Sequence, residues 1–271
     1  MKWYFAVNEH GLKHAWDQIQ VAVNSARRNT HLTPICLVDQ GDHAPDAVER
    51  IAVLARSGVR IIEHRASVFS IVKEKHGLTS DTYSGHWLRC DIPILDRSDE
   101  IVLYTDIDVM FRSDPEPFGS GPEFIACAPE HRKDDWSYFN SGVMLMNLPN
   151  LRATRDHLVR HIENNISQMA PHDDQGALNS VYRGKWERLD IVYNWKPYWG
   201  FNDLAKILHF HGPKPGLVKH YIANPNPTDL IAPELYEIYQ RNVEGYSRFM
   251  TESDTYQHNP LQASKPASVL S

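Results

Sequence analysis

The stretch Ile101-Val-Leu-Tyr-Thr-Asp-Ile-Asp-Val-Met-Phe111 decides the expected fold. Its first four residues are mostly apolar and predict a short buried strand, and Asp106 and Asp108 follow where that strand should end. Because alternate residues of an extended chain point to the same side, both carboxylates should face one spot at the carboxyl end of the strand. Ligands bind at this edge of open α/β sheets.

The two carboxylates predict a metal site. Carboxylates held close together repel each other unless a cation lies between them, and Mg²⁺ or Mn²⁺ is the usual occupant. The alternative is a turn with two acidic residues, because Asp is favoured in turns. On the metal hypothesis, an Asp108→Asn variant should keep its fold and even gain a little stability without metal, because a like-charge repulsion is removed.

The composition indicates the class of protein and argues against some kinds of partner. The chain has 271 residues, 42% hydrophobic and 23% charged, which is typical of a globular protein with a full α/β core. A formal net charge of −6 without a Lys/Arg block argues against nucleic acid and anionic membranes as partners. Three cysteines, an odd number and widely spaced, favour reduced core thiols: Cys36, Cys90 and Cys127. The first residues do not resemble a secretory signal and no long apolar run occurs, so we expect a cytoplasmic location.

The first 63 residues alternate between strand and helix patterns. The expected elements are a strand at Trp3–Val7, a helix with apolar residues recurring from Leu12 to Ala26, a strand at Pro34–Asp39, a helix at Ala47–Ser57 and a strand at Gly58–Glu63. This βαβαβ order favours a parallel sheet. The segment lacks the Gly-x-Gly-x-x-Gly and Walker motifs, which argues against a dinucleotide or an ATP P-loop.

The middle of the chain continues the same pattern. We expect helices at Tyr83–Arg97 and Arg152–Met169 and strands at Glu123–Ala128, Phe139–Leu148 and Glu187–Tyr193. Pro93 should end or kink the first of these helices. Arg89, in the same helix, is either a solvated surface charge or a contact for an anionic ligand.

Three later segments carry candidate functional residues. Asp173 and Asp174 precede a helical pattern, and one of them should cap that helix. The loop from Tyr193 to Phe201 is rich in aromatic residues, which favours a platform for sugar rings over a place in the core. In His209-Phe-His-Gly-Pro-Lys-Pro215, His209 is expected to be a third ligand beside the two aspartates, because imidazole suits Mn²⁺ better than Ca²⁺. Lys214 would then supply a point charge for phosphate.

Domain organisation is simple. Residues 1–250 read as a single domain. From Thr251 onward the chain is rich in Ser, Thr, Gln, Asn, Pro and Lys, so we expect a disordered tail over residues 251–271.

Five motifs in order resemble glycosyltransferase family eight. They are Phe-Ala-Val-Asn at 5–8, Trp-Leu-Arg at 87–89 ahead of Leu-Tyr-Thr-Asp-Ile-Asp, Phe-Asn-Ser-Gly-Val-Met-Leu-Met-Asn-Leu at 139–148, Asp-Gln-Gly-Ala-Leu-Asn at 174–179 and His-Phe-His-Gly-Pro-Lys-Pro at 209–215. The resemblance covers roughly residues 3 to 216. It implies an α/β protein of the GT-A (nucleotide-diphospho-sugar transferase) fold, with a Rossmann-like mixed sheet flanked by helices.

The resemblance also implies roles for individual residues. Asp106, Asp108 and His209 would bind Mn²⁺, with Mg²⁺ as the alternative. The nucleotide-sugar would be contacted by Ala6, Asn8, Arg89, Asp106, Ile107, Asp108, Asn140, Gly142, Gly212 and Lys214. Catalysis would rest on Asp174, Gln175 and Lys214, and the donor sugar would lie among Asn140, Gly142, Asp174 and Gln175.

The chain departs from the family pattern at three places. The last motif usually reads His-x-x-Gly-x-x-Lys-Pro and is one residue shorter here, so Lys214 should reach differently and His211 competes with His209 as ligand. Pro129 and Glu130 stand where the family commonly has Asp, which puts one donor-sugar contact in doubt. The tail is not basic, so we expect at most weak peripheral membrane association.

The implied activity is that of a retaining, Mn²⁺-dependent hexosyltransferase that takes a UDP-hexose donor and a saccharide or other hydroxyl acceptor, in bacterial-type surface polysaccharide or glycan synthesis. Retention needs either a carboxylate nucleophile, for which Asp174 is the candidate, or attack by the acceptor on the face that the diphosphate leaves, which is preferred. The alternatives are a non-catalytic nucleotide-sugar-binding protein and a phosphohydrolase of the haloacid dehalogenase type, which also places Asp-x-Asp after an apolar strand.

Overall fold

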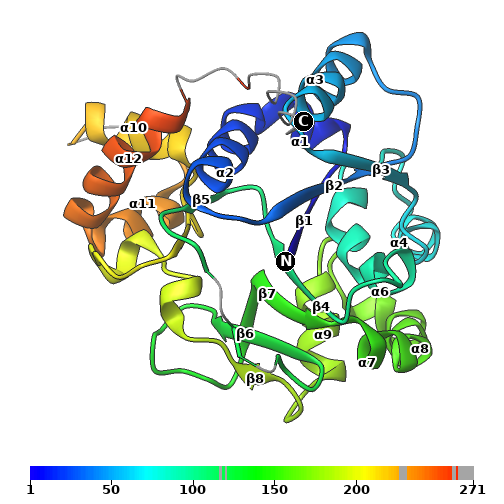
Figure 1. Cartoon of the computed structure of the whole chain (residues 1–271). Coiled ribbons are helices and arrows are strands. Elements are labelled where there is room, and N and C mark those ends of the chain that lie inside the picture. Colours follow the sequence, from blue (N-terminus) through cyan, green and yellow to red (C-terminus); the bar gives the residue numbers. More distant parts are fainter. Residues whose placement is uncertain (116–117, 120, 226–230, 258–260, 262–271) are drawn as a thin grey trace, which may run out of the picture.

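The computed structural model describes residues 1–115, 118–119, 121–225, 231–257 and 261, and Figure 1 shows the chain. Its strands are β1 (Lys2–Val7), β2 (Thr33–Asp39), β3 (Arg60–His64), β4 (Ile101–Thr105), β5 (Val109–Phe111), β6 (Ile125–Pro129), β7 (Phe139–Asn147), β8 (Glu187–Arg188) and β9 (Ile207–His209). Its α-helices are α1 (Glu9–His14), α2 (Trp16–Asn29), α3 (Pro45–Arg56), α4 (Phe69–Lys75), α5 (Ser84–Trp87), α6 (Ile92–Leu95), α7 (Leu148–Ala153), α8 (Arg155–Asn165), α9 (Asp174–Val181), α10 (Pro215–Ala223), α11 (Pro233–Gln240) and α12 (Val243–Gln257). Short 3₁₀ helices are η1 (Leu88–Asp91), η2 (Ile166–Gln168), η3 (Ile191–Tyr193) and η4 (Pro197–Trp199).

A seven-stranded sheet in the order β3-β2-β1-β4-β7-β6-β8 forms the centre. The strands β3, β2, β1 and β4 run parallel to one another, which confirms the βαβαβ prediction. The strand β7 runs antiparallel to β4 and β6, so the sheet is mixed.

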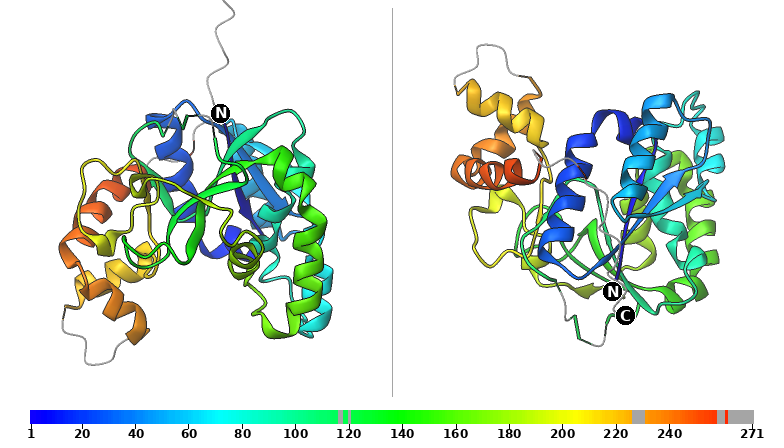
Figure 2. Two further views of the ribbon diagram at one scale, coloured as in Figure 1. Left: turned by 90° about the horizontal axis from the view of Figure 1, so that it is seen from below. Right: turned by 45° about the horizontal axis from the view of Figure 1, so that its top comes forward.

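Helices cover both faces of the sheet, as Figures 1 and 2 show. Alternation along β1 explains why. Trp3, Phe5 and Val7 pack with side chains of α2 and α3, whereas Tyr4 belongs to the cluster on the other face, with side chains of α4 and α8. The three cysteines are buried and free, as expected.

Pairing of β4 with β7 places two predicted segments side by side. Thr105 pairs with Val143, and the backbone N–H of Asp106 donates to the carbonyl of Gly142 over 2.8 Å. The segment from Asn140 to Gly142 therefore lies beside the first aspartate.

A second sheet brings the histidine motif to the same place. The strand β5 follows Asp108 directly and pairs antiparallel with β9, so that Val109 lies opposite His209. The backbone N–H of Phe210 donates to the carbonyl of Asp108 over 2.9 Å. Residues about a hundred positions apart are thus brought together by backbone hydrogen bonds.

The expected helices over Leu12–Ala26 and Arg152–Met169 are each divided, the first at Ala15 and the second at Thr154. Two further expected elements differ more. The predicted helix at Tyr83–Arg97 is broken into α5, η1 and α6, because Pro93 cannot donate a backbone hydrogen bond at the start of α6. The predicted strand at Glu187–Tyr193 keeps two residues as β8 and then turns into η3, where the Asp190 side chain accepts from the backbone N–H of Val192 over 3.1 Å.

The helices α10, α11 and α12 gather at one end of the molecule beside α2 and β5 (Figures 1 and 2). The expected tail boundary at 251 is wrong, because α12 extends to Gln257. Tyr256 is buried, and its hydroxyl accepts from the Asn29 amide over 2.7 Å. The rest of the expected tail, except Leu261, lies outside the described residues. Among the helices that the structure describes, none combines the length and apolarity needed to cross a membrane.

Candidate functional site

Asp106, Asp108 and His209 lie together at the carboxyl end of β4. One ligand atom from each lies within 4.8 Å of the others. Asp108 and His209 are buried, at 5% and 2% exposure, whereas Asp106 is partly exposed. The three residues expected to bind a metal are therefore brought together, and His211 lies in a different cluster.

Each carboxylate of the acidic pair forms an ion pair with a basic side chain. Arg89 Nη2 lies 2.8 Å from Asp106 Oδ1, and the Lys214 ammonium contacts Asp108 Oδ2. Burial would raise the pKa of Asp108, but Lys214 and His209 more than offset it and keep that pKa well below its usual range. The premise of the expected gain in stability from Asp108→Asn does not hold, because the change removes an ion pair with Lys214.

Arg89 is an internal residue. It is 4% exposed, and its Nη1 donates to the carbonyl of Ser141 over 2.9 Å. Its Nε lies 2.9 Å from Asp174 Oδ2, and its guanidinium lies over the ring of Tyr104, 4.6 Å from the centroid. The interpretation of Arg89 as a solvated surface charge is excluded, and the residue ties Asp106 to Asp174.

The two aspartates at the start of α9 divide their roles. Asp173 is the N-cap, and its side chain accepts from the backbone N–H of Gly176 over 2.9 Å. Asp174 is buried. Burial raises the pKa of Asp174 to about 7, although Arg89 opposes the shift.

A cleft of about 370 Å³ leads to the acidic pair. The residues lining it include many of those predicted: Ala6, Asn8, Arg89, Asp106, Ile107, Asp108 and Lys214. The side chain of Asn8 is already used within the chain. It donates to the carbonyl of Thr82 over 2.7 Å and accepts from the backbone N–H of Gly11 over 2.9 Å.

Packing and backbone conformation explain why glycine occupies two of the positions predicted to contact the nucleotide-sugar. A Cβ on Gly142 would lie 2.2 Å from His209 Cε1, so the imidazole occupies the space that any larger residue would need. Gly212 has a φ of 89°, and a Cβ there would lie 3.1 Å from Ile238. Gly212 is not among the described residues that line the cleft.

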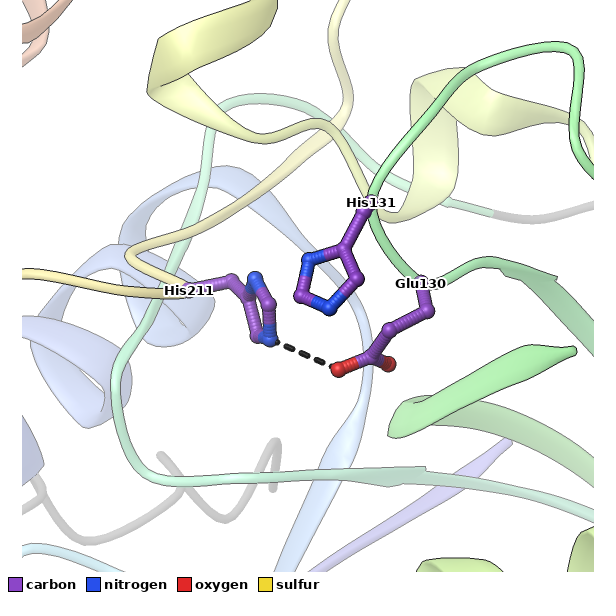
Figure 3. Close-up of side chains that lie close together, drawn as sticks. All are labelled: Glu130, His131 and His211. Atoms are coloured by element: carbon purple, nitrogen blue, oxygen red, sulfur yellow. Dashed lines mark hydrogen bonds and ion pairs between the residues drawn. The ribbon is translucent and has the colours of Figure 1, made fainter. Parts of the chain in front are cut away.

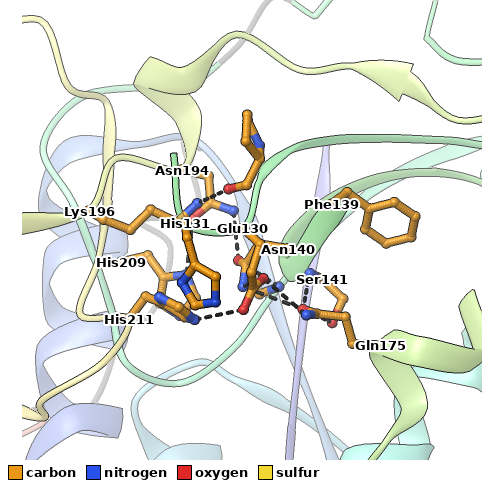
Figure 4. A network of polar contacts seen from close by, with 12 residues as sticks. Glu130, His131, Phe139, Asn140, Ser141, Gln175, Asn194, Lys196, His209 and His211 are labelled. Atoms are coloured by element: carbon orange, nitrogen blue, oxygen red, sulfur yellow. Dashed lines mark hydrogen bonds and ion pairs between the residues drawn. The ribbon is translucent and has the colours of Figure 1, made fainter. Parts of the chain in front are cut away.

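A chain of amides orients His209, and Figure 4 shows it. The backbone N–H of Gly142 donates to Asn140 over 3.1 Å, which identifies the atom facing it as Oδ1. The Asn140 amide nitrogen then donates to Glu130 over 2.8 Å, and Asn194 donates to Asn140 Oδ1 over 2.9 Å. The oxygen of Asn194 is therefore left to accept from His209 Nδ1 over 3.0 Å.

This chain leaves His209 Nε2 as the atom with a free electron pair, and Nε2 lies 3.4 Å from Asp108 Oδ1. Asn194 is fully buried, and it was not singled out from the sequence. Asn194 stands four residues before Tyr198 and belongs to no motif, so its contact with His209 is evident only from the fold.

We expect Asn194→Ala to weaken Mn²⁺ binding by roughly 10- to 100-fold, because residues that orient a metal-binding histidine have effects of this size. Titration of Mn²⁺ followed by electron paramagnetic resonance measures it. Asn164→Ala, at an exposed position of α8, is the matched control. Equal Mn²⁺ affinity in Asn194→Ala and the control would contradict the orienting role.

Glu130 makes hydrogen bonds and an ion pair that the sequence did not predict. Its Oε2 accepts from Asn140 and from Gln175 Nε2, the latter over 3.0 Å, and its Oε1 lies 2.9 Å from His211 Nε2. Burial would raise its pKa, but these hydrogen bonds lower the pKa of Glu130 to about 2. Gln175 also accepts from the backbone N–H of Ser141 over 2.7 Å, so the residues predicted around a sugar do lie together.

The aromatic loop is mostly core. Trp195 and Tyr198 are buried in a cluster with Tyr246 and Phe249, so their interpretation as a sugar platform is wrong. The reason is that α12 packs against η4 and covers these rings. Trp199 is partly exposed, and its indole N–H donates to the carbonyl of residue 131 over 2.8 Å.

Part of the chain is similar to a known protein family. The sequence model described as glycosyl transferase family 8 matches residues 126–227, a segment that contains His209 and Lys214 but begins after Asp108. Glucoside xylosyltransferase 1 from Danio rerio is 27% identical over 146 residues, which are 46% of this chain and 32% of that protein. The chain spans about a third of this curated relative. These matches confirm the resemblance inferred from the motifs.

Two solved structures illustrate the fold. The glycosyltransferase GlyE of Streptococcus pneumoniae TIGR4 superposes with a TM-score of 0.57 at 18% identity, over 96% of this chain and 64% of that chain. The galactosyltransferase LgtC in complex with donor and acceptor sugar analogs gives a TM-score of 0.54 at 18% identity, over 86% of this chain and 98% of that chain. At these identities the likeness shows the fold alone, and it confirms the expected GT-A fold.

Proposed function

We propose, from the match of residues 126–227 to glycosyl transferase family 8, that this chain transfers a hexose from a UDP-sugar to a hydroxyl acceptor with retention of configuration. The observation that carries the proposal is the meeting of Asp106, Asp108 and His209 at a cleft that Lys214 also lines. A cytoplasmic location and a role in surface polysaccharide or glycan synthesis stay predictions.

The donor set fits a divalent metal. Two carboxylates and one imidazole suit Mn²⁺, and the amide chain through Asn194 turns Nε2 of His209 toward Asp108. A bound ion would supply positive charge to the departing diphosphate. Mg²⁺ is the alternative, although the imidazole favours Mn²⁺.

The residues around the metal ligands would hold the donor. Lys214, with half of its side chain exposed, can leave Asp108 and pair with phosphate once a metal neutralises that carboxylate. Ala6 and Asn8 also line the cleft, and the nucleoside would lie against them. Because the side chain of Asn8 is engaged within the chain, its contribution would be to the shape of the loop.

The polar cluster of Asn140, Asp174 and Gln175 would surround the sugar. Asp174 is buried and its Oδ2 is paired with Arg89, which argues against this carboxylate as the nucleophile. This supports attack by the acceptor hydroxyl on the face that the diphosphate leaves, with the leaving phosphate accepting the hydroxyl proton. On this route Asp174 and Arg89 orient the site.

A screen of UDP-glucose, UDP-galactose and their N-acetyl forms, with and without Mn²⁺, tests the proposal. UDP-xylose is added because the curated relative is named as a xylosyltransferase. Slow Mn²⁺-dependent release of UDP from at least one donor, detected by mass spectrometry, is the expected result. Binding without turnover for any acceptor would favour a nucleotide-sugar-binding protein, and release of phosphate from phosphate esters would favour the phosphohydrolase.

We expect UDP to bind at least about tenfold more tightly than ADP or GDP in excess Mn²⁺, roughly 1.4 kcal/mol, because the chain lacks the glycine motifs of purine nucleotide loops. Isothermal titration calorimetry of the three diphosphates measures the difference. ADP and GDP carry the same diphosphate as UDP, so they are the controls for binding through the metal ion. Equal affinities would remove uridine from the proposal and leave a general diphosphate site.

A further inference from the structure

A second group of potential metal ligands lies beside the first. Glu130 follows β6 directly, His131 is its neighbour, and His211 follows β9 by two residues. One ligand atom from each of the three residues lies within 4.8 Å of the others, and Figure 3 shows the three side chains converging. His131 is exposed, whereas Glu130 and His211 are partly buried.

The hydrogen bonds around His211 indicate which of its ring nitrogens carries the proton. The hydroxyl of Tyr198 lies 3.1 Å from the backbone carbonyl of Glu130, which can only accept, so the hydroxyl donates there. The phenol oxygen therefore accepts from His211 Nδ1 over 2.9 Å. His211 Nε2 then faces Glu130 Oε1 over 2.9 Å.

With the imidazole proton on Nδ1, this contact is favourable only if a second proton or a metal ion lies between His211 Nε2 and Glu130 Oε1. Nε2 of an imidazole with its proton on Nδ1 has a lone pair, and a lone pair directed at a carboxylate oxygen is repelled. A proton on Nε2 satisfies the contact, and so does a metal ion bound by both atoms. The exposed ring of His131, whose centroid lies 5.4 Å from that of His211, supplies a further nitrogen that an ion pair alone would not need.

We propose that Glu130, His131 and His211 bind a divalent transition-metal ion such as Zn²⁺ or Co²⁺. Two imidazoles and one carboxylate form a three-ligand set that leaves a coordination position open for water or a hydroxyl oxygen. Neighbouring side chains already fix two of these three ligands. Glu130 Oε2 is fixed by Asn140 and Gln175, and the Nδ1 of His211 is fixed by Tyr198.

The second site is separate from the first. The amide chain directs His209 Nε2 toward Asp108, whereas His211 Nε2 is directed toward Glu130. Asn140 and Gln175, which hold Glu130 Oε2, are the residues that the proposed function assigns to the sugar, so the inference that a sugar reaches the second site rests on that function. A hydroxyl of the donor or acceptor is then the expected ligand of the open coordination position.

Counting bound ions tests the second site. Tag-free protein is dialysed against excess Zn²⁺ and then against buffer with micromolar free Zn²⁺, and the ions per chain are measured by mass spectrometry, with Co²⁺ absorption as a second readout. Wild-type protein should hold two ions. His131→Ala, a change at an exposed residue, should hold one, and Asp108→Asn should also hold one by losing the other site. Combining the two changes should leave none, and His31→Ala, an exposed histidine elsewhere, should leave two.

Two results would overturn the second site. One is a single ion per chain that Asp108→Asn removes and His131→Ala leaves in place. The other is a count of two that His131→Ala does not change. Protein that holds two ions but turns over no nucleotide-sugar would uphold the second site while contradicting the proposed function.

Discussion

Asp108→Asn should leave the chain folded and reduce sugar transfer by roughly 100-fold or more, because the departing diphosphate loses part of the charge that stabilises it. Asp108 is buried between His209 and Lys214, and an amide of nearly the same size keeps the packing. Loss of the ion pair with the half-exposed Lys214 should lower stability slightly. Transfer rates at saturating UDP-sugar and a thermal melt measure the two effects.

Asp203→Asn provides the control for this variant, since Asp203 is an exposed aspartate away from the acidic pair. Its transfer rate should equal that of the wild type. A folded Asp108→Asn protein with a rate near that of the control would remove the metal site from the mechanism. His209→Ala should likewise weaken the Mn²⁺ response more than His211→Ala, because the chain of amides orients His209 toward the acidic pair.

Arg89→Ala should lower the free energy of unfolding by roughly 3–5 kcal/mol, because removing one partner of a buried ion pair leaves uncompensated charge behind. Arg89 is buried, and its loss would strand Asp174 and free Asp106. Urea unfolding followed by circular dichroism measures the change. The variant should also lose transfer activity, since Asp106 would no longer be held.

Two further variants sharpen this prediction. Arg132→Ala removes a fully exposed arginine that pairs with Asp134, and its unfolding midpoint should match that of the wild type. Adding Asp174→Asn to Arg89→Ala removes the stranded charge and should recover part of the lost stability. If Arg89→Ala unfolds at the same urea concentration as Arg132→Ala, Arg89 does not hold the site together.

Local patterns predicted the framework of the fold. Apolar runs and their alternation located β1, β2, β3, β4 and β7, because buried strands must be apolar on the faces that helices cover. The acidic pair at the end of β4 and His209, the last residue of β9, were expected at one edge for the same reason, and they lie there.

The features that the sequence did not predict depend on contacts between distant segments. Asn194 and Glu130 carry no motif, and their roles arise because β6, β7 and the loop before β9 meet at His209. The aromatic loop looked exposed because it is rich in polar and turn residues. The later helix α12 covers Trp195 and Tyr198, and no local pattern reports that packing.

The binding of Mn²⁺ in the presence of UDP tests whether Asp106, Asp108 and His209 form the metal site. It is best measured by electron paramagnetic resonance in the His131→Ala background, so that the proposed second site does not enter the count. We expect one UDP-linked Mn²⁺ per chain, and either Asp108→Asn or His209→Ala should reduce the Mn²⁺ affinity by at least about tenfold. Mn²⁺ affinity that neither change alters would contradict the assignment of Asp106, Asp108 and His209 as the metal site.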